Sequence, residues 1–184
     1  MKRHLPFALT TLRLLLGPVA LLCALTNVPR WVYLPILIAG TLSDVYDGVL
    51  ARRFGVATPA LRRYDSLTDV VYYLFVLAVA FLLCQPVITQ HWLLIVLILL
   101  SEAGCILVSY VRFGKYPATH SYLAKGYGLS LFAAFSALLV FNAGSWAVIA
   151  LTVVALTANL EIIAIHLRAN APPVDVRSIF SLRQ

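Results

Sequence analysis

Six runs of mostly apolar residues, each long enough to cross a lipid bilayer, dominate this chain of 184 residues. A membrane-spanning helix needs roughly 20 such residues, and short polar segments separate the runs. Hydrophobic residues make up 62% of the chain and charged residues only 11%, a composition that excludes a soluble globular domain. The sequence therefore predicts an all-α, polytopic membrane protein. We expect the spans at residues 8–25, 31–50, 65–83, 91–110, 124–141 and 145–167.

These spans use nearly the whole chain, so we expect one membrane domain over residues 1–184. A basic N-terminal segment, residues 1–7, precedes the first span, and a tail, residues 168–184, follows the last. Basic residues before an apolar run are also typical of a secretory signal peptide. Because Arg13 interrupts the first run and five more spans follow, we expect that run to remain as a membrane helix.

Positive charges are distributed unevenly among the joints between the spans. If six helices alternate in direction, one side of the membrane receives both termini and the two joints that are rich in lysine and arginine, whereas the other side receives only Arg30. Short cytoplasmic loops are enriched in these residues, so we expect both termini in the cytoplasm. The net charge of +7 then favours anionic lipid head groups and phosphorylated metabolites at that face. Nucleic acid is not an expected partner, because no soluble basic domain is present.

Four aspartates lie near the predicted cytoplasmic ends of the second and third spans: Asp44, Asp47, Asp65 and Asp69. Each pair is spaced by three or four residues, so its side chains project from one side of a helix. Two antiparallel helices would bring the four carboxylates together, and such a cluster needs cations. Oxygen ligands favour Mg²⁺ or Mn²⁺ over zinc. The sequence predicts a metal site here; the structural alternative is an ion-pair network with neighbouring arginines.

Small residues surround the first aspartate pair. Gly48 and Ala51 share a helix face with Asp44 and Asp47, and that face lets a ligand approach the helix backbone. Arg52, one turn beyond Gly48, lies where its guanidinium can hold a phosphate that also contacts the metals. This arrangement is typical of a phosphate-transfer site.

These residues resemble the signature of the CDP-alcohol phosphotransferase family, D-x2-D-G-x2-A-R-x8-G-x3-D-x3-D. The chain matches seven of the eight fixed positions, and Leu61 stands at the position of the second glycine. A leucine side chain fills space that glycine leaves open, so Leu61 is expected to narrow the nucleotide pocket. The opening LPFALTTLRLLLGPV is also similar to the start of phosphatidylglycerophosphate synthases, although the chain lacks the proline that those enzymes carry after the third aspartate.

The resemblance implies a dimeric membrane enzyme of phospholipid biosynthesis. It would transfer a substituted phosphate from a CDP-linked lipid, such as CDP-diacylglycerol, to an alcohol and release CMP. Two ions, Mg²⁺ or Mn²⁺, would be held by Asp44, Asp47 and Asp65. Asp69 would share the second ion or act as the general base. The implied nucleotide-binding residues are Asp44, Gly48, Ala51 and Arg52.

The joint between the fourth and fifth spans suggests the class of acceptor. It contains Arg112, Lys115, His120 and Lys125. Cations beside the site favour an acceptor that carries phosphate, such as glycerol 3-phosphate or inositol phosphate. The alternative is that these cations only set the topology. Lys125 is the strongest functional candidate, because it falls inside the start of a helix.

Two intramembrane glutamates, Glu102 and Glu161, either shape the acceptor pocket or pair with Arg13 or another cation, and we favour pairing. Two other functions remain open: a cation-coupled transporter, and a lipid-binding subunit with weakened catalysis, suggested only by Leu61. We expect the protein in the bacterial inner membrane with its site at the cytosolic face.

Overall fold

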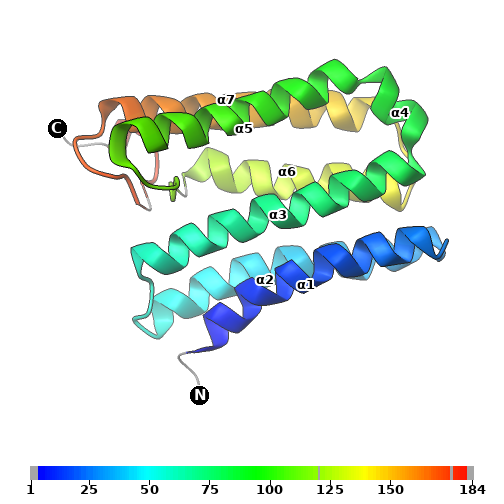
Figure 1. The fold of residues 1–184 in the computed structure, drawn as a ribbon, viewed down its shortest axis with the longest axis horizontal. Coiled ribbons are helices and arrows are strands. Elements are labelled where there is room, and N and C mark those ends of the chain that lie inside the picture. The colour runs from blue at the N-terminus through cyan, green and yellow to red at the C-terminus, as the bar shows by residue number, and fades with distance from the viewer. Residues whose placement is uncertain (1–3, 120, 175, 182–184) are drawn as a thin grey trace.

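The computed structural model describes residues 4–119, 121–174 and 176–181, and within these ranges the chain is helical, without a β-strand. Six long helices run back and forth along one direction (Figure 1). They are α1 (Leu5–Leu25), α2 (Tyr33–Arg53), α3 (Pro59–Leu83), α5 (Trp92–Phe113), α6 (Tyr122–Leu139) and α7 (Ser145–Arg168). Shorter helical segments are η2 (Arg30–Val32), α4 (Gln85–Gln90) and η3 (Ile179–Ser181). The basic N-terminal segment and the C-terminal tail lie partly outside the described ranges.

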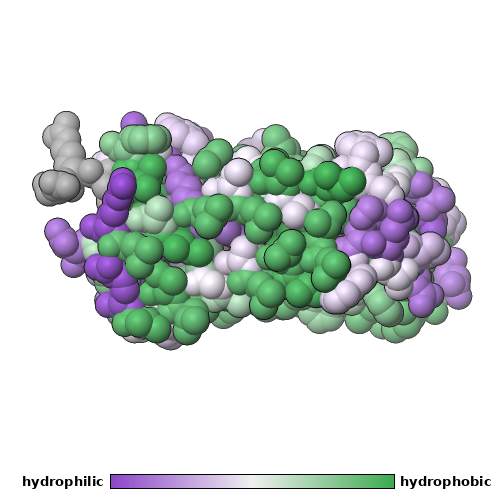
Figure 2. Space-filling model, turned by 90° about the horizontal axis from the view of Figure 1, so that it is seen from above, coloured by the Kyte–Doolittle hydropathy of each residue, from purple (hydrophilic) through white to green (hydrophobic). Residues whose placement is uncertain are grey.

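Each long helix in the described ranges has the length and apolar composition needed to cross a membrane. Large hydrophobic side chains cover the outside of the bundle, as at Leu15 and Val111. Figure 2 shows hydrophobic residues across the middle of one face and hydrophilic residues at both ends. This distribution suits a lipid surround, and the predicted all-α class with six spans is confirmed.

The largest difference from the predicted helix boundaries is at the start of α3. Helix α3 begins at Pro59, six residues before the predicted start at Asp65. Thr58 caps its first turn by accepting a hydrogen bond from the Leu61 amide at 3.2 Å, and proline is favoured at the first helical position. Hydropathy marks only the apolar part of such a helix. Asp65 and Asp69 are therefore held well inside a helix rather than at its start. The short helix α4 was not predicted.

The helices pack as two groups. Helices α1, α2 and α3 contact one another through α1, while α5 and α6 both pack on α7. Helix α6 joins the groups by contacting α2 and α3. Figure 1 shows both ends of the chain on the same side as the α2–α3 and α5–α6 joints. The basic joints therefore share one end of the bundle, and its cytoplasmic orientation stays a prediction.

Arg30, at the opposite end, has a structural role. Its guanidinium donates hydrogen bonds to the Leu83 carbonyl at 2.8 Å and to Asn142 Oδ1 at 3.0 Å. These bonds connect the start of α2 to the ends of α3 and α6. Carbonyls at helix ends lack partners within the helix, so Arg30 satisfies groups that would otherwise be exposed near the membrane.

The contact between α2 and α3 depends on a glycine, and this leads to a prediction. A Cβ at Gly40 would lie 2.5 Å from Tyr72 Oη. Tyr72 cannot easily move away, because it is only 1% exposed and its hydroxyl donates a hydrogen bond to the Ile36 carbonyl. Gly40→Ala should therefore lower the free energy of unfolding by about 1–3 kcal/mol through overpacking. The measurement is thermal unfolding of the purified protein in detergent.

Gly126→Ala is the matched control, because Gly126 also lies in a long helix and a Cβ there meets nothing within 4 Å. Alanine is favoured over glycine in helices by about 1 kcal/mol, so this variant should be as stable as the wild type or more so. Equal midpoints for the two variants would contradict the packing argument.

Candidate active site

The guanidinium of Arg13, on α1, stands among the four aspartates. One nitrogen, Nη1, lies 3.1 Å from Asp44 Oδ1 and also bonds Asp69, and the other, Nη2, lies 2.5 Å from Asp47 Oδ2 and also bonds Asp65. Arg13 is only 1% exposed. The four carboxylates of α2 and α3 do meet, as their spacing predicted, but around an arginine from a third helix.

Arg13 thus pairs with the aspartates. Among the described residues neither Glu102 nor Glu161 forms a salt bridge, so the expected pairing of these glutamates with Arg13 or another cation is wrong. Glu161 Oε1 instead accepts hydrogen bonds from Ser178 Oγ at 3.0 Å and the Ile179 amide at 3.3 Å, which connects α7 to the C-terminal tail. Glu102 lies near the side chains of Tyr127 and Asn159.

The four carboxylates differ in exposure. The side chains of Asp47 and Asp65 are 4% and 5% exposed, whereas those of Asp44 and Asp69 are 44% and 32% exposed. Thr10 Oγ1 holds Asp47 with a further hydrogen bond of 2.8 Å to Oδ2. Two carboxylates therefore anchor the cluster between the helices, and two remain accessible to a ligand.

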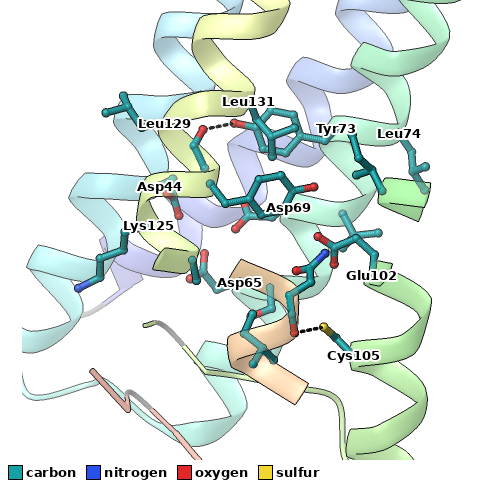
Figure 3. Close-up of a pocket in the computed structure, with 18 of the residues that line it drawn as sticks. Asp44, Asp65, Asp69, Tyr73, Leu74, Glu102, Cys105, Lys125, Leu129 and Leu131 are labelled. Carbon is teal, nitrogen blue, oxygen red and sulfur yellow. Dashed lines mark hydrogen bonds between the residues drawn. The ribbon is translucent and has the colours of Figure 1, made fainter. Parts of the chain in front are cut away.

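A pocket of about 630 Å³ opens beside the cluster, and Asp44, Asp65 and Asp69 line it. Its walls come from α2 and α3 on one side and from α5, α6 and α7 on the other. Figure 3 shows the labelled aspartates beside this space, with Leu74 and Leu131 farther along it. A pocket of this size holds a small organic ligand, and its mixed lining suits a molecule with a charged head and an apolar part.

Three carboxylates form a set that fits a metal ion. Asp44, Asp47 and Asp65 each offer one oxygen, and these oxygens lie within 4.8 Å of one another. Hard oxygen donors of this kind suit a divalent cation such as Mg²⁺. One guanidinium balances only one of the four carboxylate charges, so the cluster retains negative charge for further cations. Asp69 is not part of this set, although it contacts the same arginine.

The guanidiniums of two further arginines lie beside Gly48: that of Arg52, which is on α2 itself, and that of Arg62, which is on α3. A Cβ at Gly48 would lie 3.4 Å from Arg62 Nη1 and 3.7 Å from Arg52 Nη1, so both guanidiniums lie against this glycine. Both arginines line the pocket, and Ala51 is buried on the same helix. Arg62 was not predicted as a site residue. Its spacing of three residues before Asp65 was the available signal, because such residues share a helix face.

Leu61, the departure from the family signature, lies half-buried on α3 beside this face. With Gly48, Ala51 and Asp47 it lines a separate cavity of only about 10 Å³, which is about the space of one water molecule. The leucine therefore fills the gap between α2 and α3 behind the cluster. It is absent from the lining of the large pocket.

The cations of the α5–α6 joint are not all at the pocket. Lys125 lines the pocket, and its exposed side chain places Nζ 5.6 Å from the centre of the Tyr122 ring. Arg112 donates to the Leu167 and Ala169 carbonyls at 2.6 and 3.2 Å, which caps α7. Lys115 is exposed, and neither it nor Arg112 lines the pocket. His120 lies outside the described residues.

The sequence model of the CDP-alcohol phosphatidyltransferase family matches residues 3–159. No curated protein and no solved structure matches the chain significantly. The matched segment includes Arg13, the four aspartates and Glu102. Members of the family transfer a phosphatidyl group from a CDP-alcohol donor to an alcohol acceptor and depend on metal. Since the match covers most of the chain, the protein belongs to the CDP-alcohol phosphatidyltransferase family.

Proposed function

We propose that the protein transfers a phosphatidyl group from CDP-diacylglycerol to an alcohol, releasing CMP, as a step of phospholipid biosynthesis. The observation that carries the proposal is the convergence of Asp44, Asp65 and Asp69 on one pocket with a mixed polar and apolar lining. The acyl chains of such a donor would extend along the apolar part. By analogy with the family, the enzyme is proposed to be a homodimer. Its proposed location is the bacterial inner membrane, and the basic joints favour a site at the cytosolic face.

Each part of the cluster has a distinct proposed role. Asp44, Asp47 and Asp65 would hold Mg²⁺ or Mn²⁺, two ions in the family scheme, and such ions neutralise the charge of the donor pyrophosphate and of the leaving CMP. Arg52, with Gly48 and Ala51 beneath it, would hold the nucleotide phosphate. Arg62, buried next to the same glycine, would support it.

Asp69 is proposed as the general base. Its side chain faces the pocket and lies outside the three-carboxylate set, so it is available to a substrate hydroxyl. The acceptor oxygen forms a bond to the donor phosphorus while the bond between that phosphorus and the CMP oxygen breaks. The hydroxyl proton passes to Asp69.

One assay tests the whole proposal. Purified protein in mixed micelles with CDP-diacylglycerol is supplied with Mg²⁺ or Mn²⁺ and with glycerol 3-phosphate, inositol phosphate or other alcohols, and CMP release is followed. We expect release that stops when the metal is chelated and that requires one acceptor. Binding of the CDP-lipid without CMP release under any condition would instead support the lipid-binding subunit.

Lys125 is the proposed contact for an acceptor phosphate, and glycerol 3-phosphate is the first acceptor to test. Lys125→Ala should raise the KM for the acceptor about tenfold, because a hydrogen bond to a charged group is lost. The KM for CDP-diacylglycerol should stay within about twofold, since the nucleotide is held elsewhere. The measurement is steady-state kinetics with each substrate varied in turn.

Lys115→Ala is the matched control, because Lys115 is a lysine of the same joint but does not line the pocket. Its acceptor KM should equal that of the wild type. If both substitutions change the acceptor KM equally, Lys125 does not bind the acceptor phosphate, and both lysines act only in setting the membrane topology.

A further inference from the structure

A second group of polar side chains lines the pocket, on the wall formed by α5, α6 and α7. Glu102 lies near the Tyr127 and Asn159 side chains, and Asn159 Nδ2 donates a hydrogen bond to Ser101 Oγ at 2.8 Å. Glu102, Tyr127 and Asn159 all line the pocket. Three helices therefore hold one carboxylate in a wall that is otherwise largely apolar.

Glu102 lies at about the same depth in the bundle as Asp69. Asp69 follows Pro59, the first residue of α3, by ten residues, and Glu102 precedes Phe113, the last residue of α5, by eleven. With a rise of about 1.5 Å per residue, both lie roughly 15 Å from the end that carries the basic joints. Figure 3 shows Glu102 on the α5 side of the pocket that Asp65 and Asp69 line. Asp69 and Glu102 therefore line one pocket at a similar depth, from opposite walls.

The chemistry of Glu102 selects what it binds. Among the described residues no lysine or arginine forms a salt bridge with it, and an ionisable side chain inside a membrane bundle commonly marks a ligand position. A carboxylate has about four lone-pair sites, more than the neighbouring Tyr127 and Asn159 side chains can fill with one hydrogen bond each. The remaining sites accept hydrogen bonds from a hydroxyl and repel a phosphate.

We propose that Glu102 binds a hydroxyl of the acceptor other than the one that reacts. This inference rests on the proposed function and narrows the acceptor to polyols: one hydroxyl reaches Asp69 and a second donates to Glu102, which Tyr127 and Asn159 orient. An acceptor phosphate is directed away from Glu102, toward the cations at the rim. Glycerol 3-phosphate and inositol phosphate both meet these conditions, and an alcohol with a single hydroxyl does not.

The test compares glycerol 3-phosphate with 3-hydroxypropyl phosphate, which differs only by lacking the middle hydroxyl. If inositol phosphate is the acceptor used, it is compared instead with analogues that each lack one of its hydroxyls. Wild-type kcat/KM should fall about 10- to 100-fold when the hydroxyl is removed. Glu102→Ala should lose this discrimination, because its kcat/KM should fall for glycerol 3-phosphate but stay unchanged for 3-hydroxypropyl phosphate. Glu102→Gln retains an accepting oxygen and should retain most of the discrimination.

Glu161→Ala is the matched control, because Glu161 is the other glutamate near the membrane and bonds the tail rather than lining the pocket. It should discriminate as the wild type does. The KM for CDP-diacylglycerol in Glu102→Ala should stay within about twofold, which a misfolded variant would not show. Discrimination that is absent in the wild type, or unchanged in Glu102→Ala, overturns this inference and leaves the proposed function standing. An absence of CMP release by the wild type with every acceptor overturns both.

Discussion

Asp69→Asn should reduce the rate of CMP release by about 10²- to 10⁴-fold, the range that general-base catalysis contributes. Asparagine has nearly the same shape as aspartate but cannot take the hydroxyl proton. Because Asp69 lies outside the three-carboxylate set, binding of metal and of CDP-diacylglycerol should change by less than about threefold. Single-turnover measurements of CMP release, together with equilibrium binding of the CDP-lipid, separate the two effects.

Asp65→Asn is the matched control, because it makes the same chemical change on the same helix one turn earlier, within the three-carboxylate set. This variant should lose metal binding, donor binding and turnover together. If Asp69→Asn also loses the CDP-lipid to the same extent, Asp69 acts as a metal ligand and another group must take the proton.

Local sequence patterns were sufficient to predict the long helices of the fold and the aspartate cluster of the candidate site. Runs of about 20 apolar residues predicted each long helix, because the bilayer requires that length. The spacing of Asp44, Asp47, Asp65 and Asp69 predicted the cluster, since residues three or four apart share a helix face. Both signals are contained within one or two neighbouring helices.

What the sequence did not reveal depends on contacts between distant segments. Arg13 bonds carboxylates that lie 31 to 56 residues further along the chain, and an arginine in an apolar run does not indicate which acid it meets. The Glu102 group likewise draws on three helices, of which α5 and α7 pack closely. Even the start of α3 was missed, because the cap at Thr58 precedes charged residues that hydropathy treats as a joint. Each of these features depends on distant segments or on a cap within a polar stretch, whereas the predicted ones follow from spacing within one or two neighbouring helices.

Arg13 bonds the same aspartates that form the candidate metal site, so the guanidinium and a metal ion would compensate the same carboxylate charges. Arg13→Gln should destabilise the metal-free protein by about 3–5 kcal/mol, the cost of breaking a buried ion pair from one side. Four carboxylates would then lie together without the one guanidinium that bonds all of them. Saturating Mn²⁺ should restore most of that stability, because a ligand that binds only the folded state stabilises it by mass action. The variant should also bind Mn²⁺ at least about tenfold more tightly, since the Arg13 guanidinium no longer competes for the carboxylates.

Thermal unfolding with and without Mn²⁺, and titration of Mn²⁺ followed by its electron paramagnetic resonance signal, measure these effects without any turnover. Arg30→Gln is the matched control: it also removes a guanidinium that connects helices, but one whose partners are the Leu83 carbonyl and Asn142 at the far end of the bundle. Its loss of stability should be independent of Mn²⁺, and its affinity for the ion should equal that of the wild type. If Mn²⁺ rescues both variants equally, or rescues neither, Arg13 and the metal do not act on the same carboxylates. A rescue confined to Arg13→Gln would mean that the arginine holds the four aspartates together until metal binds, which explains how so many carboxylates can be placed between three helices of a membrane protein.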